Sequence, residues 1–199
     1  MAIKPKFILT DTTRTIVRDG RTITLHQIQS CRYISAEEGH EVYKDQLGGW
    51  VEKESNLSHT GSCWISQNAC VFGDAVVSEH AHIHGDAIIC DHAKVYGNAC
   101  ILNRVEIYGN ANVHGNARLY CRAKVFDNAE VYENAIVGAD AKIYGHAKVH
   151  GKAEVSDNAN VFENAEVTDE AKVYDFAIVR KDVVLGGKLI ANKHVTFGK

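Results

Sequence analysis

Residues 93–117 read AKVYGNACILNRVEIYGNANVHGNA, and alanine or valine returns at every sixth position of this stretch. The same step runs from Ala69 to Ala177, where nineteen successive positions hold eighteen alanines and one valine, Val105. A branched aliphatic residue stands two places after each of these nineteen positions. An internal period sustained over this length is the sequence signature of a solenoid.

Strand geometry explains the repeating unit. The alanine and the aliphatic residue are two apart, so both point to one side of a short strand, and the residues beside them point outward. The last two places hold pairs such as Gly97-Asn98 and Asp127-Asn128, which are residue types that tolerate a positive φ at a corner. Each hexapeptide therefore predicts one strand and one corner, and three hexapeptides predict a triangular coil of 18 residues. Residues 57–197 then give between seven and eight coils.

Residues 1–56 do not repeat. Short strands are expected at residues 7–9, 15–17 and 22–25, with a hairpin turn at Asp19-Gly20 between the last two. A parallel solenoid exposes the apolar cross-section of its first coil, and terminal repeats need a cap. We therefore expect residues 1–50 to cap the first coil, with Trp50 and Trp64 packed over it. The predicted division is a cap at 1–56 and a repeat domain at 57–199.

The junction between the two parts carries a specific resemblance. The segments Gly48-Gly49-Trp50-Val51-Glu52, Asn56-Leu57-Ser58 and Gly61-Ser62-Cys63-Trp64-Ile65, followed by the repeats, resemble the enterobacterial YdcK-type hexapeptide-repeat proteins and similar phage-encoded proteins. The likeness covers nearly the whole chain and implies an all-β fold. That fold is a single-stranded, three-sided, left-handed parallel β-helix behind a small N-terminal β-rich cap. Because that group has no assigned activity, the resemblance implies no site residue.

Two enzyme classes that share the hexapeptide β-helix, acyltransferases and γ-class carbonic anhydrases, build their sites between the subunits of a trimer. The transferases place a catalytic histidine on a loop that leaves the helix, whereas the register here runs from Ala69 to Ala177 without insertion. The anhydrases need three histidines, two of them five residues apart and the third about two coils, or 36 residues, earlier. His114 and His150 are 36 residues apart, but the residue five beyond His150 is the core residue Val155. The run His80-x-His82-x-His84 is only a weak metal signal. We predict no catalytic residue, no metal site and no cofactor.

Charge, hydropathy and cysteine content limit which binding partners and which cellular compartment are expected for this protein. A net charge of -3 without basic blocks argues against binding to nucleic acid. No apolar run approaches the roughly 20 residues of a membrane span, and the N-terminus lacks the apolar region of a secretory signal. The six cysteines form no CxxC pair, which disfavours a disulfide framework or a zinc site and favours the cytoplasm.

Residues 18 apart stack on one outer face of the predicted coil. One such face carries an aromatic column with aliphatic residues beside it. Stacked aromatics stabilise a parallel ladder, and a contiguous outward apolar strip also favours self-association. The predicted self-association interface consists of Phe72, Ile88, Tyr108, Phe126, Tyr144, Phe162 and Ile178. A second face stacks Glu130, Lys148 and Glu166 with alternating charge, which is typical of a solvated surface.

Two functions fit these patterns. The favoured hypothesis is a non-enzymatic scaffold or binding protein that presents flat faces to a protein partner and forms a homo-oligomer, with a trimer favoured. The alternative is an acyltransferase-like protein, or one that sequesters nucleotides or acyl-CoA, with sites in clefts between subunits. In that case an anionic small molecule would bind His82, His84, Arg104, Arg118 and Arg122.

Overall fold

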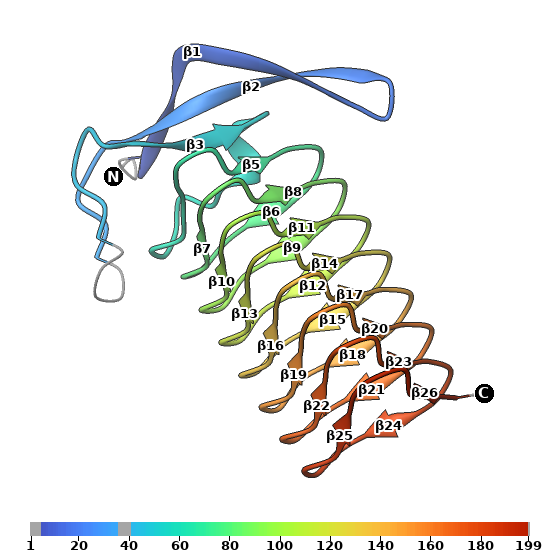
Figure 1. The fold of residues 1–199 in the computed structure, drawn as a ribbon. Helices are drawn as coiled ribbons and strands as arrows, with labels where there is room; N and C mark the ends of the chain where they lie inside the picture. The colour runs from blue at the N-terminus through green and yellow to red at the C-terminus, as the bar shows by residue number, and fades with distance from the viewer. Residues whose placement is uncertain (1–4, 36–40, 199) are drawn as a thin grey trace.

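The computed structural model describes residues 5–35 and 41–198. The chain forms a β-solenoid of about 8 turns whose three sides are parallel sheets, preceded by an antiparallel β-hairpin region (Figure 1). The predicted all-β parallel solenoid with an N-terminal β-rich segment is therefore confirmed.

Within the described ranges, the three sheets contain eleven, eight and seven strands. The repeat strands of the eleven-stranded sheet are β5 (Cys70–Val71), β8 (Ile88–Ile89), β11 (Glu106–Ile107), β14 (Lys124–Val125), β17 (Lys142–Ile143), β20 (Asn160–Val161), β23 (Ile178–Val179) and β26 (Thr196–Phe197). The eight-stranded sheet consists of β4 (Trp64–Ile65), β7 (His82–Ile83), β10 (Cys100–Ile101), β13 (Arg118–Leu119), β16 (Ile136–Val137), β19 (Glu154–Val155), β22 (Lys172–Val173) and β25 (Ile190–Ala191). The seven-stranded sheet consists of β6 (Val76–Val77), β9 (Lys94–Val95), β12 (Asn112–Val113), β15 (Glu130–Val131), β18 (Lys148–Val149), β21 (Glu166–Val167) and β24 (Val184–Leu185).

The core follows the six-residue period. Every residue of the step from Ala69 to Ala177, and every aliphatic residue two places later, has no exposed surface. Parallel pairing joins residues 18 apart, as in Ile101 with Leu119 on neighbouring coils. Alanine fits because the inward side chains of three strands meet in a space that larger residues would overfill.

The corners depend on backbone conformation. Every sixth residue from Gly61 to Lys193 has a positive φ, between 52° and 76°. These residues are the first of the two predicted corner positions, and many carry a carboxylate. The side chain of Asp127 accepts a hydrogen bond from the backbone N–H of Gly145, 3.1 Å away and one coil later. Glu133 does the same for the N–H of Gly151 at 2.8 Å. Corner carboxylates thus satisfy backbone groups that the strand ladder leaves without a partner.

The N-terminal segment extends the eleven-stranded sheet. Strands β1 (Phe7–Arg18) and β2 (Arg21–Ser30) form an antiparallel hairpin that turns at Asp19-Gly20, as predicted. The two strands expected at 7–9 and 15–17 form one strand with an irregularity between Leu9 and Thr13. Strand β2 pairs with β3 (Leu47–Val51), and β3 pairs with β5, as Figure 1 shows. Trp50 and Trp64 lie within β3 and β4, which pair with the strands of the next coil, and not above the first coil.

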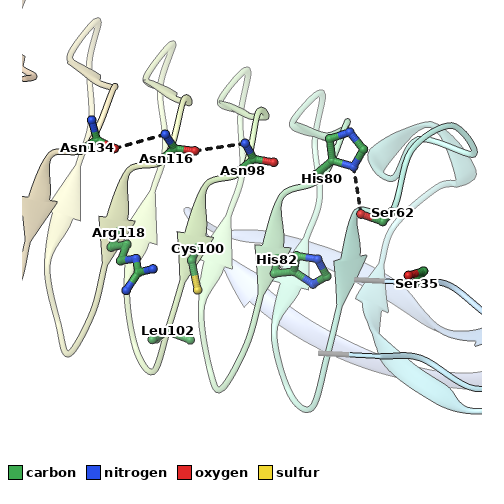
Figure 2. A pocket seen from close by; sticks show the side chains of 10 residues that line it. All are labelled: Ser35, Ser62, His80, His82, Asn98, Cys100, Leu102, Asn116, Arg118 and Asn134. Carbon is green, nitrogen blue, oxygen red and sulfur yellow. Dashed lines mark hydrogen bonds between the residues drawn. The ribbon is translucent and has the colours of Figure 1, made fainter. Parts of the chain in front are cut away.

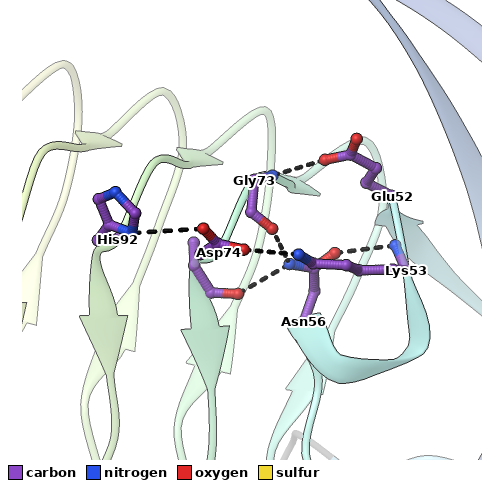
Figure 3. A network of polar contacts seen from close by, with 7 residues as sticks. Glu52, Lys53, Asn56, Gly73, Asp74 and His92 are labelled. Carbon is purple, nitrogen blue, oxygen red and sulfur yellow. Dashed lines mark hydrogen bonds and ion pairs between the residues drawn. The ribbon is translucent and has the colours of Figure 1, made fainter.

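A side chain adds to a single backbone bridge, between Leu57 and Val77, where the seven-stranded sheet begins. The short helix η1 (Glu54–Asn56) interrupts the first coil here. Asn56 is fully buried, and its amide donates to the carbonyl oxygens of Gly73 at 3.0 Å and Ala75 at 2.8 Å. Its side-chain oxygen accepts from the backbone N–H of Lys53 at 2.9 Å (Figure 3). Asn56 therefore links the entering chain to the second coil.

Candidate functional site

The aromatic column of the eleven-stranded sheet stacks upon itself. The rings of Tyr108, Phe126, Tyr144 and Phe162 follow one another at centroid distances of 4.8 to 4.9 Å, with tilts of 5° or less. Because each ring lies face to face with the rings of the neighbouring coils, ring edges and not ring faces point outward. The column therefore stabilises the ladder whether or not a partner covers it.

The N-terminal hairpin lies over the upper part of this face. Its Ile16 and Ile23 pack against a buried cluster that includes Phe72, which is 3% exposed. The guanidinium of Arg18 lies 5.3 Å from the ring centroid of Tyr108. Of the predicted interface residues, Phe72, Ile88 and Tyr108 belong to or contact this cluster. The remaining four, Phe126, Tyr144, Phe162 and Ile178, lie on later coils.

The seven-stranded sheet carries a second stacked column, which the sequence reasoning did not anticipate. The ring of His114 lies between those of Tyr96 at 4.6 Å and Tyr132 at 5.2 Å, and His150 follows at 4.5 Å from Tyr132. The imidazole of His114 lies 3.0 Å from a carboxylate oxygen of Glu130. These two histidines therefore have structural contacts on the face that was expected to be solvated.

A groove of about 690 Å³ runs along the outer face of the eight-stranded sheet (Figure 2). Most of its lining comes from outward residues of β7, β10 and β13 and from the corner that precedes them, and one residue comes from the N-terminal segment. The lining residues described by the structure are Ser35, Ser62, His80, His82, Asn98, Cys100, Leu102, Asn116, Arg118 and Asn134. From Ser62 to Asn134 the groove crosses four coil spacings, or roughly 19 Å at about 4.8 Å per spacing. We call it the Arg118 groove.

Three stacked residues form the floor of the Arg118 groove. Cys100 pairs in register with His82 on one side and with Arg118 on the other. His82 is 7% exposed, Cys100 is half-buried, and Arg118 is exposed. The guanidinium of Arg118 makes no hydrogen bond or ion pair with the described part of the chain, and none of the described lining residues is acidic. Among the described residues, the guanidinium of Arg118 is therefore the only permanent charge on the floor.

Polar side chains hold one wall of the groove in fixed positions. The amide of Asn98 donates to the side-chain oxygen of Asn116 at 3.1 Å, and Asn116 donates to Asn134 at 3.2 Å. Further along the same wall, the hydroxyl of Ser62 lies 3.0 Å from Nδ1 of His80 (Figure 2). Because each group is held by its neighbour, the wall presents its polar atoms in set directions.

The other predicted ligand-binding residues fall into two groups. The ring of His84 stacks beside that of His82 at 6.1 Å. Arg104 and Arg122 line a separate hollow over the adjoining corner, where each faces a carboxylate. Arg122 forms two hydrogen bonds with Asp140, at 2.7 and 2.6 Å, which lower the pKa of that carboxyl. Arg104 lies 3.7 Å from Asp86. The structure therefore brings His82 together with Arg118, and it neutralises Arg104 and Arg122 elsewhere.

Of the residues that line the groove, sequence reasoning selected only His82 and Arg118. Cys100 and the wall of asparagines stand at 18-residue intervals in columns that a column-by-column reading could have found. Ser35 comes from the N-terminal segment, and no period in the sequence indicates which face that segment approaches.

The described residues contain no group of three His, Cys, Asp or Glu side chains placed to hold a metal ion. No helix in the described ranges is long and apolar enough to cross a membrane. None of the six cysteines forms a disulfide. No protein-family model matches the chain, and a search of curated proteins found no match.

Proposed function

We propose that this protein is a non-enzymatic binding protein that holds a small anionic ligand in the Arg118 groove. One observation carries the proposal: the guanidinium of Arg118 has no ion pair with the described residues and projects from a floor without carboxylates. Arg122, only four residues later, is paired with Asp140. An arginine fork matches the geometry of a carboxylate or a phosphate and binds it through two parallel hydrogen bonds.

The rigidity of the groove supports binding. The wall is held by the hydrogen bonds among Asn98, Asn116 and Asn134, and the floor belongs to consecutive strands of one sheet. A ligand that binds a preformed site avoids most of the entropic cost of ordering protein groups. The proposal further includes the left-handed hexapeptide-repeat type of solenoid, which the six-residue period and the junction sequence around Trp64 support.

Native mass spectrometry with a panel of carboxylates, nucleotides and acyl-CoAs tests the groove. The wild-type protein should retain at least one anionic compound, and Arg118→Gln should lose it. Arg122→Gln is the matched control, because its arginine is already paired with Asp140 outside the groove. If the wild-type protein retained no member of the panel, or if Arg118→Gln bound it equally well, the binding proposal would be wrong.

A second function, self-association into a homo-oligomer with a trimer favoured, rests on the lower part of the aromatic column. Phe126, Tyr144 and Phe162 are only half-buried and lie on coils beyond those whose residues pack against the hairpin. Sedimentation velocity of wild-type protein should give an oligomer, and Phe126→Glu should dissociate it. Tyr132→Glu, in the stacked column of another face, should leave it assembled. A wild-type monomer would exclude this second function.

A further inference from the structure

His59 lies between the beginning of the N-terminal segment and the short helix η1. The backbone N–H of Lys6 donates to its Nδ1 at 3.1 Å, and its Nε2 lies 2.7 Å from a carboxylate oxygen of Glu54. An ionised carboxylate only accepts hydrogen bonds, so Nε2 carries the ring proton and Nδ1 is the acceptor. Both contacts are therefore made by one neutral tautomer of the imidazole.

The ring of His59 also packs against the first turn of chain in β1. The six-residue period, continued backward from Ala69, predicts an aliphatic residue at position 59. The imidazole found there stacks on the ring of Phe7 at 4.4 Å with a tilt of 12°, and Phe7 has no exposed surface. The stacked ring and the bond from Lys6 thus attach the same short stretch of chain to the first coil.

The titratable and charged groups around His59 act on an imidazolium in opposite directions. The carboxylate of Glu54 attracts it, and the buried ammonium of Lys6 repels it. That ammonium donates to the carbonyl oxygen of Cys63 at 2.9 Å, and Arg32 is a second cation near Lys6. Burial raises the pKa of the Cys63 thiol, so this group adds no negative charge near neutral pH. Whatever the balance of these charges, an imidazolium has hydrogen on both nitrogens and cannot accept from the Lys6 N–H.

We propose that His59 is a pH-sensitive attachment point, which holds the beginning of β1 on the solenoid only while its imidazole is neutral. Histidine commonly changes charge between about pH 5 and 8. A proton on Nδ1 would place two N–H donors against each other across the present 3.1 Å contact, so Lys6 and Phe7 move away from the ring. The change is reversible, because no covalent bond forms or breaks. It does not depend on the anion-binding function proposed for the Arg118 groove.

Hydrogen exchange followed by mass spectrometry tests this attachment in the full-length protein. Protection factors, which correct for the intrinsic effect of pH on exchange, are compared at about pH 8 and about pH 5 for residues 6–9. We expect the protection of residues 6–9 to fall about fivefold or more at the lower pH, which is the effect of losing one hydrogen bond. Residues 118–125, in the middle of the solenoid, should keep their protection.

Variants separate the titration of His59 from other effects of acid. His59→Gln keeps an acceptor and a donor but does not titrate, so its protection at residues 6–9 should change less than about twofold. Glu54→Gln removes the carboxylate that attracts the imidazolium, so the loss of protection should begin at a lower pH.

Unchanged protection in the wild-type protein, or an equal loss in His59→Gln, would overturn the proposal. Should His59→Gln fail to fold, an NMR titration of the wild-type protein replaces it. The amide of Lys6 and the ring of His59 should then shift with the same midpoint, and two different midpoints would overturn the proposal as well.

Discussion

Removing the carboxylate of Asp127 should destabilise the solenoid by about 2 kcal/mol. Asp127 has a φ of 58°, and its carboxylate accepts a hydrogen bond from the N–H of Gly145 at 3.1 Å. In Asp127→Ala, the loss of this hydrogen bond lowers the free energy of unfolding by about 1 kcal/mol, a modest amount because the site is exposed. Alanine in the left-handed region contributes about 1 kcal/mol more. Asp127→Asn keeps both an acceptor oxygen and a residue type that tolerates this φ, so it should cost less than about 0.5 kcal/mol.

The converse change should stabilise the protein. Cys121 occupies an equivalent corner with a φ of 60°, one coil before Ala139. Cys121→Asp supplies the kind of carboxylate that Asp127 offers to Gly145, with an expected gain of about 0.5 to 1 kcal/mol. Urea denaturation at a constant m value measures all three variants. The role assigned to corner carboxylates would be refuted if Asp127→Asn cost as much as Asp127→Ala, or if both were neutral.

Three further predictions follow from other parts of the structure. Asn56→Ala should cost about 3 kcal/mol in urea denaturation, because it removes the three hydrogen bonds of a fully buried side chain. Asn56→Asp should be no better, since it replaces the amide donor with a carboxylate that turns an acceptor toward two carbonyl oxygens. Phe126→Ala should lower the free energy of unfolding by about 2 kcal/mol, because it removes a half-buried ring stacked at 4.9 Å on both sides. Phe176 is 54% exposed, so Phe176→Ala should lower it by less than about 1 kcal/mol. The free energy of unfolding should fall as the pH rises above 9. The pKa of Cys90 is about 12 in the folded state, so between these two pH values its thiol ionises only in the unfolded chain. Cys90→Ala should flatten this decline, and an equally steep decline in that variant would contradict the assignment.

The sequence predicts the solenoid well because the same small unit is repeated. Each hexapeptide carries its own pattern of inward residues and its own corner residues. An irregular position such as Val105 therefore leaves the prediction unchanged, because the neighbouring hexapeptides keep the pattern. The N-terminal hairpin has no such repetition. Its turn at Asp19-Gly20 is a local signal and was predicted correctly. Its contacts from Ile16 and Arg18 to residues about 50 to 90 positions later leave no pattern in the sequence.

The candidate site was predictable only in part. His82 and Arg118 were identified because they are outward residues that can bind an anion. Arg122 was grouped with them, although the residue 18 positions later is Asp140 for Arg122 and Ile136 for Arg118. The partner one coil away therefore decides whether an arginine is free to bind a ligand. Ser35 could not be assigned to the groove, because its place depends on how the N-terminal segment folds back.

The core and the surface of this solenoid have different periods, and the difference limits how the chain can change in length. Inward residues repeat every six positions, so deleting one hexapeptide would leave every remaining alanine and valine facing inward. The same deletion would rotate the rest of the chain by one side of the triangle. Asn116 and Asn134 would no longer stand in line with Asn98, and the aromatic column would continue into a different face. Insertions or deletions that preserve these surfaces must therefore come in multiples of 18 residues, even though the core would accept multiples of six.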